Sequence, residues 1–207
     1  TWKDLGAPNK TDVTEGPSKE VKLVYDKELE DYIRVSYSAL SSELVLRMDE
    51  LPRRLRNDNF SNIKVYVSMD DINAIELSGA ASVIFEGKYK ASSLAVDLSG
   101  ASSLSGLMVS ADRMSVECSG AASFNIEGIF KGDVDMELSG ASNGSFCGRG
   151  AGFDGELSGA SDLDADLDFS TCRVNCSGAS KVELAGKVER LSADGSGACS
   201  IDAKNLV

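Results

Sequence analysis

Apolar and polar residues alternate along most of the chain, and the alternation repeats in units of about twenty residues. Counted from the glycine of a recurring Ser-Gly-Ala tripeptide, apolar residues stand two, four and six positions before it and four and six positions after it. In the first unit, Ile75 and Leu77 precede Gly79, and Val83 and Phe85 follow it. A period of two is typical of β-strands, and no column recurs at the 3.6-residue spacing of a helix. The pattern therefore predicts short strands separated by turns.

The Ser-Gly-Ala tripeptide sets the length of the repeat. The intervals between successive glycines are 21, 20, 20, 19, 19 and 19 residues, at Gly79, Gly100, Gly120, Gly140, Gly159, Gly178 and Gly197. Such a period indicates stacked repeats that bury their apolar faces against one another. We predict an all-β fold, a single-stranded parallel β-helix of about seven coils with 19–21 residues per coil. The general rule for parallel crossovers favours right-handed winding, and a coil this short leaves left-handed winding open.

Glycine suits the turn because it tolerates a positive φ and leaves room for a stacked neighbour. Serine and alanine are small enough to stack in register, and serine can bond to turn backbone groups. A second glycine column lies eight residues after the first and predicts another corner, at Gly87, Gly128, Gly148 and Gly186.

The part of the chain before the repeats has a different pattern. Residues 1–20 have little hydrophobic pattern and are expected to be a flexible leader. Residues 21–62 contain three strand-like runs, at 21–25, 32–37 and 43–48, and are predicted to form an N-terminal β cap. The coils are predicted to occupy 63–207, so that 21–207 would form one β-helix domain.

Composition narrows the classes of function. A net charge of −12 and a pI near 4.5 argue against nucleic acid and against an anionic membrane surface as partners. No apolar run is long enough for a transmembrane segment. The absence of histidine excludes histidine-based catalytic triads and imidazole metal sites. The five cysteines are odd in number and lack a Cys-x-x-Cys spacing, and Cys176 is expected to lie too far from both Cys118 and Cys172 for a disulfide. We interpret four of them as small buried apolar residues, at Cys118, Cys172, Cys176 and Cys199.

Carboxylates form the column that most needs an explanation. The residues three positions before each glycine are acidic in six of seven units and are predicted to face outward, at Glu76, Asp97, Glu117, Glu137, Glu156, Asn175 and Asp194. The simplest interpretation is a solvated anionic face that keeps the sheet soluble. The alternative is a cation-binding surface, since Ca²⁺ prefers carboxylate oxygens.

One run adds four more outward carboxylates, at Asp162, Asp164, Asp166 and Asp168. Together with Glu137 and Glu156 they are predicted to form the most acidic patch on the surface. We take this acidic outer face as the candidate binding site, at Glu117, Glu137, Glu156, Asp162, Asp164, Asp166 and Asp168. No catalytic residue is assigned and no cofactor is expected, with Ca²⁺ as the one candidate ion. Tyr66 and Tyr89 are predicted to point outward as further contacts.

The run IKVYVSMDDINAIELSGAASV, followed by serial ELSGAS-type units, resembles the head GIN domain family of putative autotransporter adhesins. The resemblance covers residues 21–207, and that family is found mainly in Bacteroidetes. It implies a β-helix-like fold, export to the periplasm, the outer membrane surface or the extracellular space, and an adhesin or binding role. The family supplies no catalytic or ligand residues.

The sequence and the resemblance together favour a non-enzymatic binding module, secreted or at the cell surface, that recognises glycans or envelope proteins. A structural spacer and a cation-binding envelope protein are the alternatives. The enzymatic rival is a polysaccharide-degrading enzyme with paired carboxylates. Units that differ by only two residues in length leave little room for the loops that form a catalytic cleft.

Overall fold

The computed structural model describes residues 20–24, 27–38, 43–49, 52, 54, 64–68 and 72–207. The chain divides into two compact units, Thr1–Met69 and Asp70–Val207. The predicted leader, except for Glu20, lies outside the described residues.

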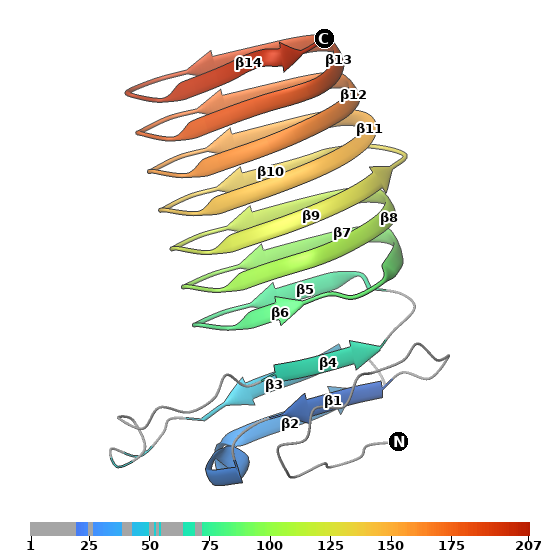
Figure 1. The fold of residues 1–207 in the computed structure, drawn as a ribbon, viewed down its shortest axis with the longest axis vertical. Helices are drawn as coiled ribbons and strands as arrows, with labels where there is room; N and C mark the ends of the chain where they lie inside the picture. The colour runs from blue at the N-terminus through green and yellow to red at the C-terminus, as the bar shows by residue number, and fades with distance from the viewer. Residues whose placement is uncertain are drawn as a thin grey trace. The chain divides into compact units, whose positions relative to one another are not determined.

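Antiparallel strand pairs make up the described part of the first unit (Figure 1). Strand β1 (Glu20–Val24) pairs with β4 (Lys64–Ser68), and β2 (Ile33–Ser38) pairs with β3 (Glu43–Met48). A 3₁₀ turn, η1 (Lys27–Tyr32), precedes β2 and buries Leu29. The structure therefore differs from the expectation that the coils begin at residue 63. The alternation shows that a strand is present at 64–68 but does not reveal its partner, which is β1.

The second unit is a β-solenoid of about seven turns, which confirms the predicted fold class. Every strand pair in it is parallel. Its strands are β5 (Ala74–Leu77), β6 (Ser82–Ile84), β7 (Lys88–Leu98), β8 (Ser103–Cys118), β9 (Ser123–Phe130), β10 (Val134–Leu138), β11 (Asn143–Leu157), β12 (Asp162–Cys176), β13 (Lys181–Gly195) and β14 (Ser200–Leu206).

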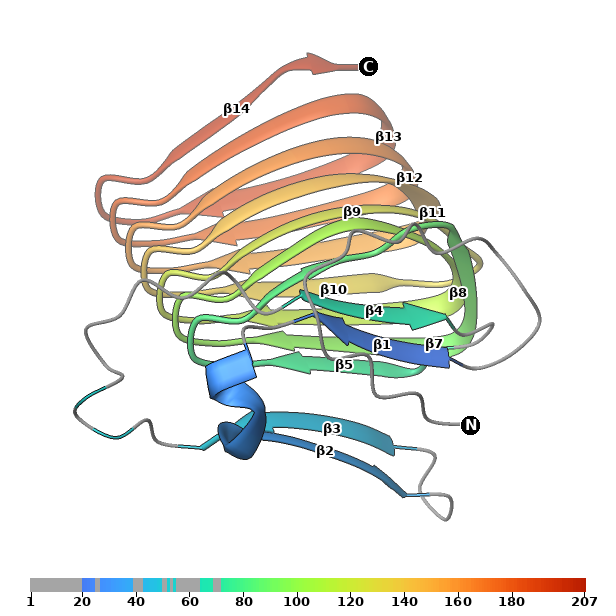
Figure 2. The ribbon, with the colours of Figure 1, turned by 60° about the horizontal axis from the view of Figure 1, so that its bottom comes forward.

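Each coil is flattened and crosses the unit twice, as Figures 1 and 2 show. A sharp Ser-Gly-Ala turn lies at one edge and a rounded bend at the other, so the coils form two layers. The front sheet follows the turns and consists of β6, β9, β14 and residues 88–91, 103–110, 143–150, 162–169 and 181–188. The back sheet precedes the next turns and consists of β5, β10 and residues 93–98, 113–118, 152–157, 171–176 and 190–195.

Stacked glycines hold the turn edge together. All seven turn glycines have φ between 72° and 78°. A Cβ built on Gly140 would lie 2.5 Å from the carbonyl oxygen of Gly120 in the coil before it. That carbonyl accepts a hydrogen bond of 2.7 Å from the Ala141 amide, so the turns cannot separate to admit a side chain without losing this bond.

Serine completes the turn, as predicted. The buried Ser161 and Ser180 hydroxyls donate to the carbonyl oxygens three residues earlier in their own turns, at 2.7 and 2.9 Å. The Ser177 hydroxyl donates across the coils to the carbonyl of Leu157 at 3.2 Å. The first two bonds satisfy turn carbonyls, those of Ser158 and Ser177, that receive no backbone donor, whereas the Leu157 carbonyl also accepts from the Ser177 amide at 2.8 Å.

Phenylalanine rings fill the middle of the core, and glycines make room for them. Phe146 contacts Phe130, Phe153 and Phe169, with ring centroids 5.6–6.3 Å apart. A Cβ on Gly148 would lie 2.4 Å from the Phe146 ring, and a Cβ on Gly128 would lie 2.3 Å from the Phe130 ring.

The second glycine column is therefore not a corner in every coil, contrary to the sequence prediction. Gly87 and Gly186 do have positive φ, at 102° and 99°. Gly128 and Gly148, however, lie within β9 and β11.

The other interior predictions are largely confirmed. Cys118, Cys172 and Cys176 are buried and Cys199 is half-buried, whereas Cys147 is exposed. The prediction for Tyr89 was wrong, because its side chain is only 5% exposed and its hydroxyl donates to the Glu86 carbonyl at 2.9 Å. The inside–outside alternation shifts by one residue at the rounded bend, so counting back from the next turn gives the wrong side. The Tyr66 side chain lies outside the described part of the chain.

We predict that Gly140→Ala destabilises the solenoid far more than Gly79→Ala does. Both residues have the same kind of φ, 75° and 72°, but a Cβ on Gly79 meets nothing within 4 Å. The Gly79 variant should cost about 1–2 kcal/mol, the penalty for a side chain in left-handed conformation. The Gly140 variant should cost at least about 3 kcal/mol, because the turn stack must open as well. Urea unfolding of both variants measures the difference, and equal losses would contradict the stacking account.

Candidate binding surface

The predicted acidic column is an in-register ladder on the outer face of the back sheet. Successive members face each other on neighbouring strands throughout, as in the pairs Glu117↔Glu137 and Glu137↔Glu156. All its carboxylates are exposed. Neighbouring charges about 4.8 Å apart repel by about 1 kcal/mol in water. The ladder is therefore held by the backbone register and not by attraction between its side chains.

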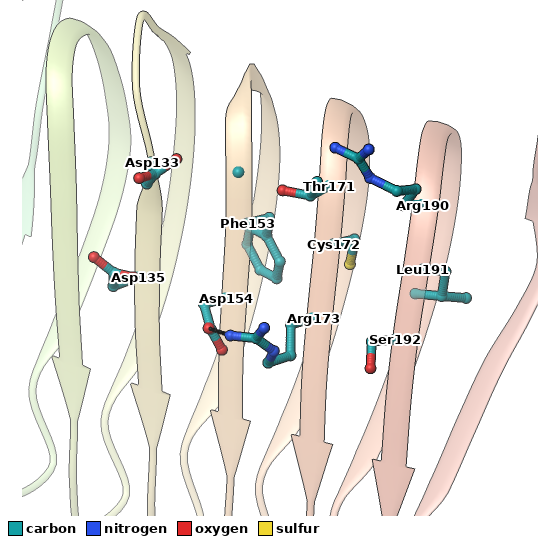
Figure 3. A pocket seen from close by; sticks show the side chains of 11 residues that line it. Asp133, Asp135, Phe153, Asp154, Thr171, Cys172, Arg173, Arg190, Leu191 and Ser192 are labelled. Carbon is teal, nitrogen blue, oxygen red and sulfur yellow. Dashed lines mark hydrogen bonds and ion pairs between the residues drawn. The ribbon is translucent and has the colours of Figure 1, made fainter.

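A second polar column runs beside the ladder, two residues closer to the rounded bend. Asp135, Asp154, Arg173 and Ser192 face one another in that order on β10, β11, β12 and β13. The Arg173 guanidinium pairs with Asp154, with Nη1 3.1 Å from Oδ2 (Figure 3). Sequence reasoning missed this column because the equivalent residues in the earlier coils are Ala74, Ala95 and Ser115, which give no uniform signal.

Two hollows lie over these two columns on the same strands. The first, of about 420 Å³, lies toward the bend and includes Asp135, Asp154, Arg173 and Ser192 in its lining (Figure 3). The second, of about 490 Å³, lies toward the turns and includes Glu137, Glu156, Asn175 and Asp194. We call this continuous region the back-sheet surface, defined by Asp135, Glu137, Asp154, Glu156, Arg173, Asn175, Ser192 and Asp194.

An irregular coil shapes the bend side of the first hollow. The residues between β9 and β10, Lys131–Asp133, interrupt what is one continuous strand in the next three coils. Gly152 follows in the next coil, and a Cβ there would lie 2.7 Å from Oδ1 of Asp133. The glycine thus leaves the space that the Asp133 carboxylate occupies beside Asp135 and Thr171 (Figure 3).

Negative charge dominates the back-sheet surface. Partial burial raises the pKa of Asp135, and the carboxylates of Asp154 and Asp133 raise it further, while Arg113 lowers it. Arg173 is the one cation among the eight residues that define the surface. The region can therefore accept several hydrogen bonds through carboxylates and donate through Arg173, Asn175 and Ser192.

The four aspartates of β12 lie elsewhere. Asp162, Asp164, Asp166 and Asp168 belong to the front sheet and point to its outer side, whereas Glu117, Glu137 and Glu156 belong to the back sheet. The structure therefore separates the predicted patch into two parts on different layers. The alternation of apolar and polar residues predicts whether a side chain points inward or outward. It does not predict which of the two sheets carries that side chain. Glu117 is on the ladder but outside the lining of the two hollows.

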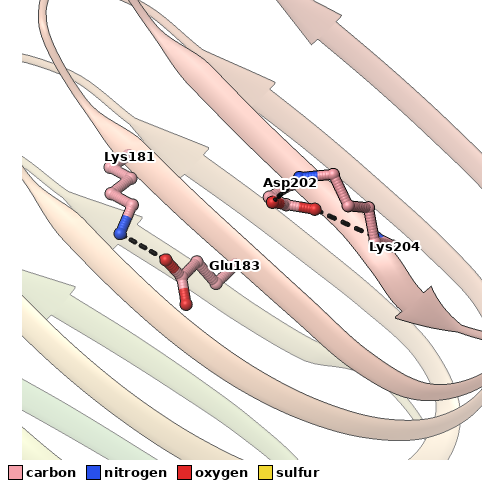
Figure 4. A network of polar contacts seen from close by, with 4 residues as sticks. All are labelled: Lys181, Glu183, Asp202 and Lys204. Carbon is pink, nitrogen blue, oxygen red and sulfur yellow. Dashed lines mark hydrogen bonds and ion pairs between the residues drawn. The ribbon is translucent and has the colours of Figure 1, made fainter.

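Cations compensate the front-sheet carboxylates. Asp162 faces Lys181 and Asp168 faces Lys187 on the next strand. Lys181 forms an ion pair with Glu183, which lowers the pKa of Glu183 and raises that of Lys181 (Figure 4). Asp202 and Lys204 form a second pair at 2.6 Å. The front face therefore has less unbalanced charge to offer a ligand than the back face.

Within the described ranges, no three His, Cys, Asp or Glu side chains are grouped so that they could hold a metal ion. The carboxylates of the ladder are therefore not grouped as the ligands of a Ca²⁺ ion would be.

We predict that Asp135→Asn raises the melting temperature at pH 7 by about 1–3 °C. A carboxyl whose pKa is raised in the folded state contributes stability at low pH and loses it as the pH rises through that pKa. The gain should therefore vanish below about pH 3, where the wild-type carboxyl is largely protonated in both states. Asp112→Asn is the control, because it removes an ion pair with Lys131 of 2.7 Å and should give no gain. A lower melting temperature for Asp135→Asn at pH 7 would contradict the assignment.

Comparison with known proteins agrees with the repeat and the fold. A family model described as "Putative auto-transporter adhesin, head GIN domain" matches residues 4–146 and 143–207. A search of curated proteins finds no match. No helix in the described segments is long and apolar enough to cross a membrane. Because the match spans nearly the whole chain, the protein belongs to this head GIN domain family.

Proposed function

We propose that this protein is an exported, non-enzymatic, adhesin-like module that binds its ligand along the back-sheet surface. The family description suggests a role at the cell surface. The ligands proposed are glycans or envelope proteins in the periplasm, at the outer membrane surface or outside the cell.

The observation that carries the proposal is the pair of adjoining hollows, of about 420 and 490 Å³, on one set of strands. Four successive strands present donors and acceptors at regular ladder spacing of about 4.8 Å. A chain of sugar hydroxyls, which both donate and accept, matches such a surface because each hydroxyl can meet a carboxylate, an amide or the guanidinium.

Short connections support binding over catalysis. The turns between β11 and β12 and between β12 and β13 are Ser158–Ser161 and Ser177–Ser180, four residues each. Strand residues and the first serine of each turn, and not long loops, therefore form the walls of the hollow beside these turns. A surface of this kind suits an extended ligand that stays in contact with water, whereas a catalytic site needs a region that excludes it.

The charge of the surface narrows the ligand class. Of the charged residues that line the two hollows, six are carboxylates and two, Arg173 and Arg190, are arginines. Charge complementarity favours neutral or amine-bearing glycans, or a basic protein segment, over acidic polysaccharides.

A glycan array that contains neutral, amine-bearing and uronic-acid-rich glycans tests the proposal. We expect hits among the first two classes. Glu137→Gln with Glu156→Gln should weaken the binding of a hit at least tenfold in titration calorimetry, because two carboxylate acceptors are lost. The matched control is Asp164→Asn with Asp166→Asn, which removes the same charge from the front sheet and should change affinity less than twofold.

The array and the variants contradict different parts of the proposal. A larger loss in the front-sheet variant would move the binding site to the other layer. The absence of hits, together with no binding to envelope proteins from the same cell, would favour a structural spacer.

A further inference from the structure

Two positions of the last coil depart together from the repeat. Gly195 stands where five earlier coils have a buried apolar residue, at Leu98, Cys118, Leu138, Leu157 and Cys176. Cys199 stands where four earlier coils have a buried serine, at Ser102, Ser142, Ser161 and Ser180. One change removes a side chain from the core beside the turn, and the other adds a thiol there.

The two departures bring Cys199 against Cys176 of the preceding coil. Cys176 and Gly195 face each other in register on β12 and β13. A Cβ on Gly195 would lie 3.0 Å from the Cys199 sulfur, so this thiol occupies the space that the missing side chain leaves above Cys176. The Cys199 thiol is also close enough to help raise the pKa of the Cys176 thiol. In addition, the Cys176 thiol donates to the Ser180 carbonyl oxygen at 3.6 Å, which places its sulfur at the same turn.

We propose that Cys176 and Cys199 are a redox-active pair that forms a disulfide between the last two coils. The other thiols lie on other coils or, as Cys172 does, farther from the turn on the same strand, and Cys147 is exposed. The bond needs the two Cβ atoms about 3.5–4.5 Å apart, a distance that a small shift of the Cys199 turn would set, and rotation of the half-buried Cys199 side chain would then bring the two sulfur atoms together.

An external disulfide supplies the oxidising equivalents. The Cys199 thiolate attacks it, forms a mixed disulfide and releases one thiolate of the oxidant. The Cys176 thiolate then attacks the Cys199 sulfur, forms the internal disulfide and releases the second thiolate. The two protein thiols lose two protons and two electrons, and the oxidant becomes two thiols. Cys199 acts first because burial, with the Cys199 contact, raises the pKa of Cys176 to about 12.

The bond would stabilise the stacking of these two coils. The link closes a loop from Cys176 to Cys199, 24 residues with both ends counted, and restricts the unfolded chain. The family's place at the cell surface is consistent with an oxidising environment. The inference does not depend on the ligand proposed for the back sheet.

The test uses the full chain with Cys147→Ser, which removes the exposed thiol. The protein is incubated with oxidised glutathione at pH 8, alkylated in denaturant and digested without reduction. Mass spectrometry should find the Cys176 and Cys199 peptides joined, with Cys118 and Cys172 alkylated. The oxidised form should melt about 5–10 °C above the form treated with dithiothreitol.

Adding Cys199→Ser provides the matched control. Serine occupies the same position in three earlier coils as a buried hydrogen-bond donor, at Ser142, Ser161 and Ser180, so this variant should fold. Its melting temperature should not respond to oxidant. Recovery of both cysteines as alkylated thiols, a Cys199 that stops at the glutathione mixed disulfide, or a bond to Cys118 or Cys172 would each overturn the proposal.

Discussion

The close approach of one turn glycine to the carbonyl of the turn before it is the constraint on which the solenoid depends. Gly140 leaves only 2.5 Å between its Cβ position and the Gly120 oxygen, and the same contact recurs in successive coils. Because the turns must stack in register, differences in coil length are absorbed elsewhere. One extra residue forms a bulge between Leu104 and Leu107, and another lies at the bend in Lys131–Asp133. The second of these places Asp133 at the first hollow, so the rigid turn edge indirectly shapes the proposed binding surface.

The same register decides the chemistry of the two faces. In-register stacking places each repeated side chain beside its equivalents in the neighbouring coils. Repeated like charges are therefore held close together although they repel each other. On the front sheet, lysines that face aspartates on the neighbouring strand reduce this repulsion, as Lys181 does opposite Asp162. On the back sheet one ion pair, between Arg173 and Asp154, forms within the two columns, and the carboxylates of the ladder remain exposed to solvent. The layer with unbalanced charge is the one that also carries the hollows, and this coincidence points to the back sheet as the binding face.

The sequence was enough to predict the coil, its length and the acidic ladder, because period-two alternation and the Ser-Gly-Ala spacing are local consequences of the stacking. The sequence was not enough to predict the direction of side chains on the far side of the rounded bend. Tyr89 is buried because the inside–outside alternation shifts by one residue at the bend. The bend also places the four β12 aspartates on the outer side of the front sheet, whereas Glu137 and Glu156 lie on the back sheet. Gly128 and Gly148 show a third limit, since a glycine in the core can serve a neighbouring ring instead of a turn. Each of these wrong predictions depends on which residues pack against one another in three dimensions. The alternation along the sequence does not identify those neighbours.

We propose that the outer face of the back sheet, and not that of the front sheet, holds the ligand. Amide chemical-shift mapping by NMR tests it most directly, because each strand segment reports separately during a titration with a bound glycan or peptide. The account predicts that the largest shifts fall in residues 134–138, 152–157, 171–176 and 190–195. Shifts concentrated instead in residues 143–150, 162–169 and 181–188 would contradict it.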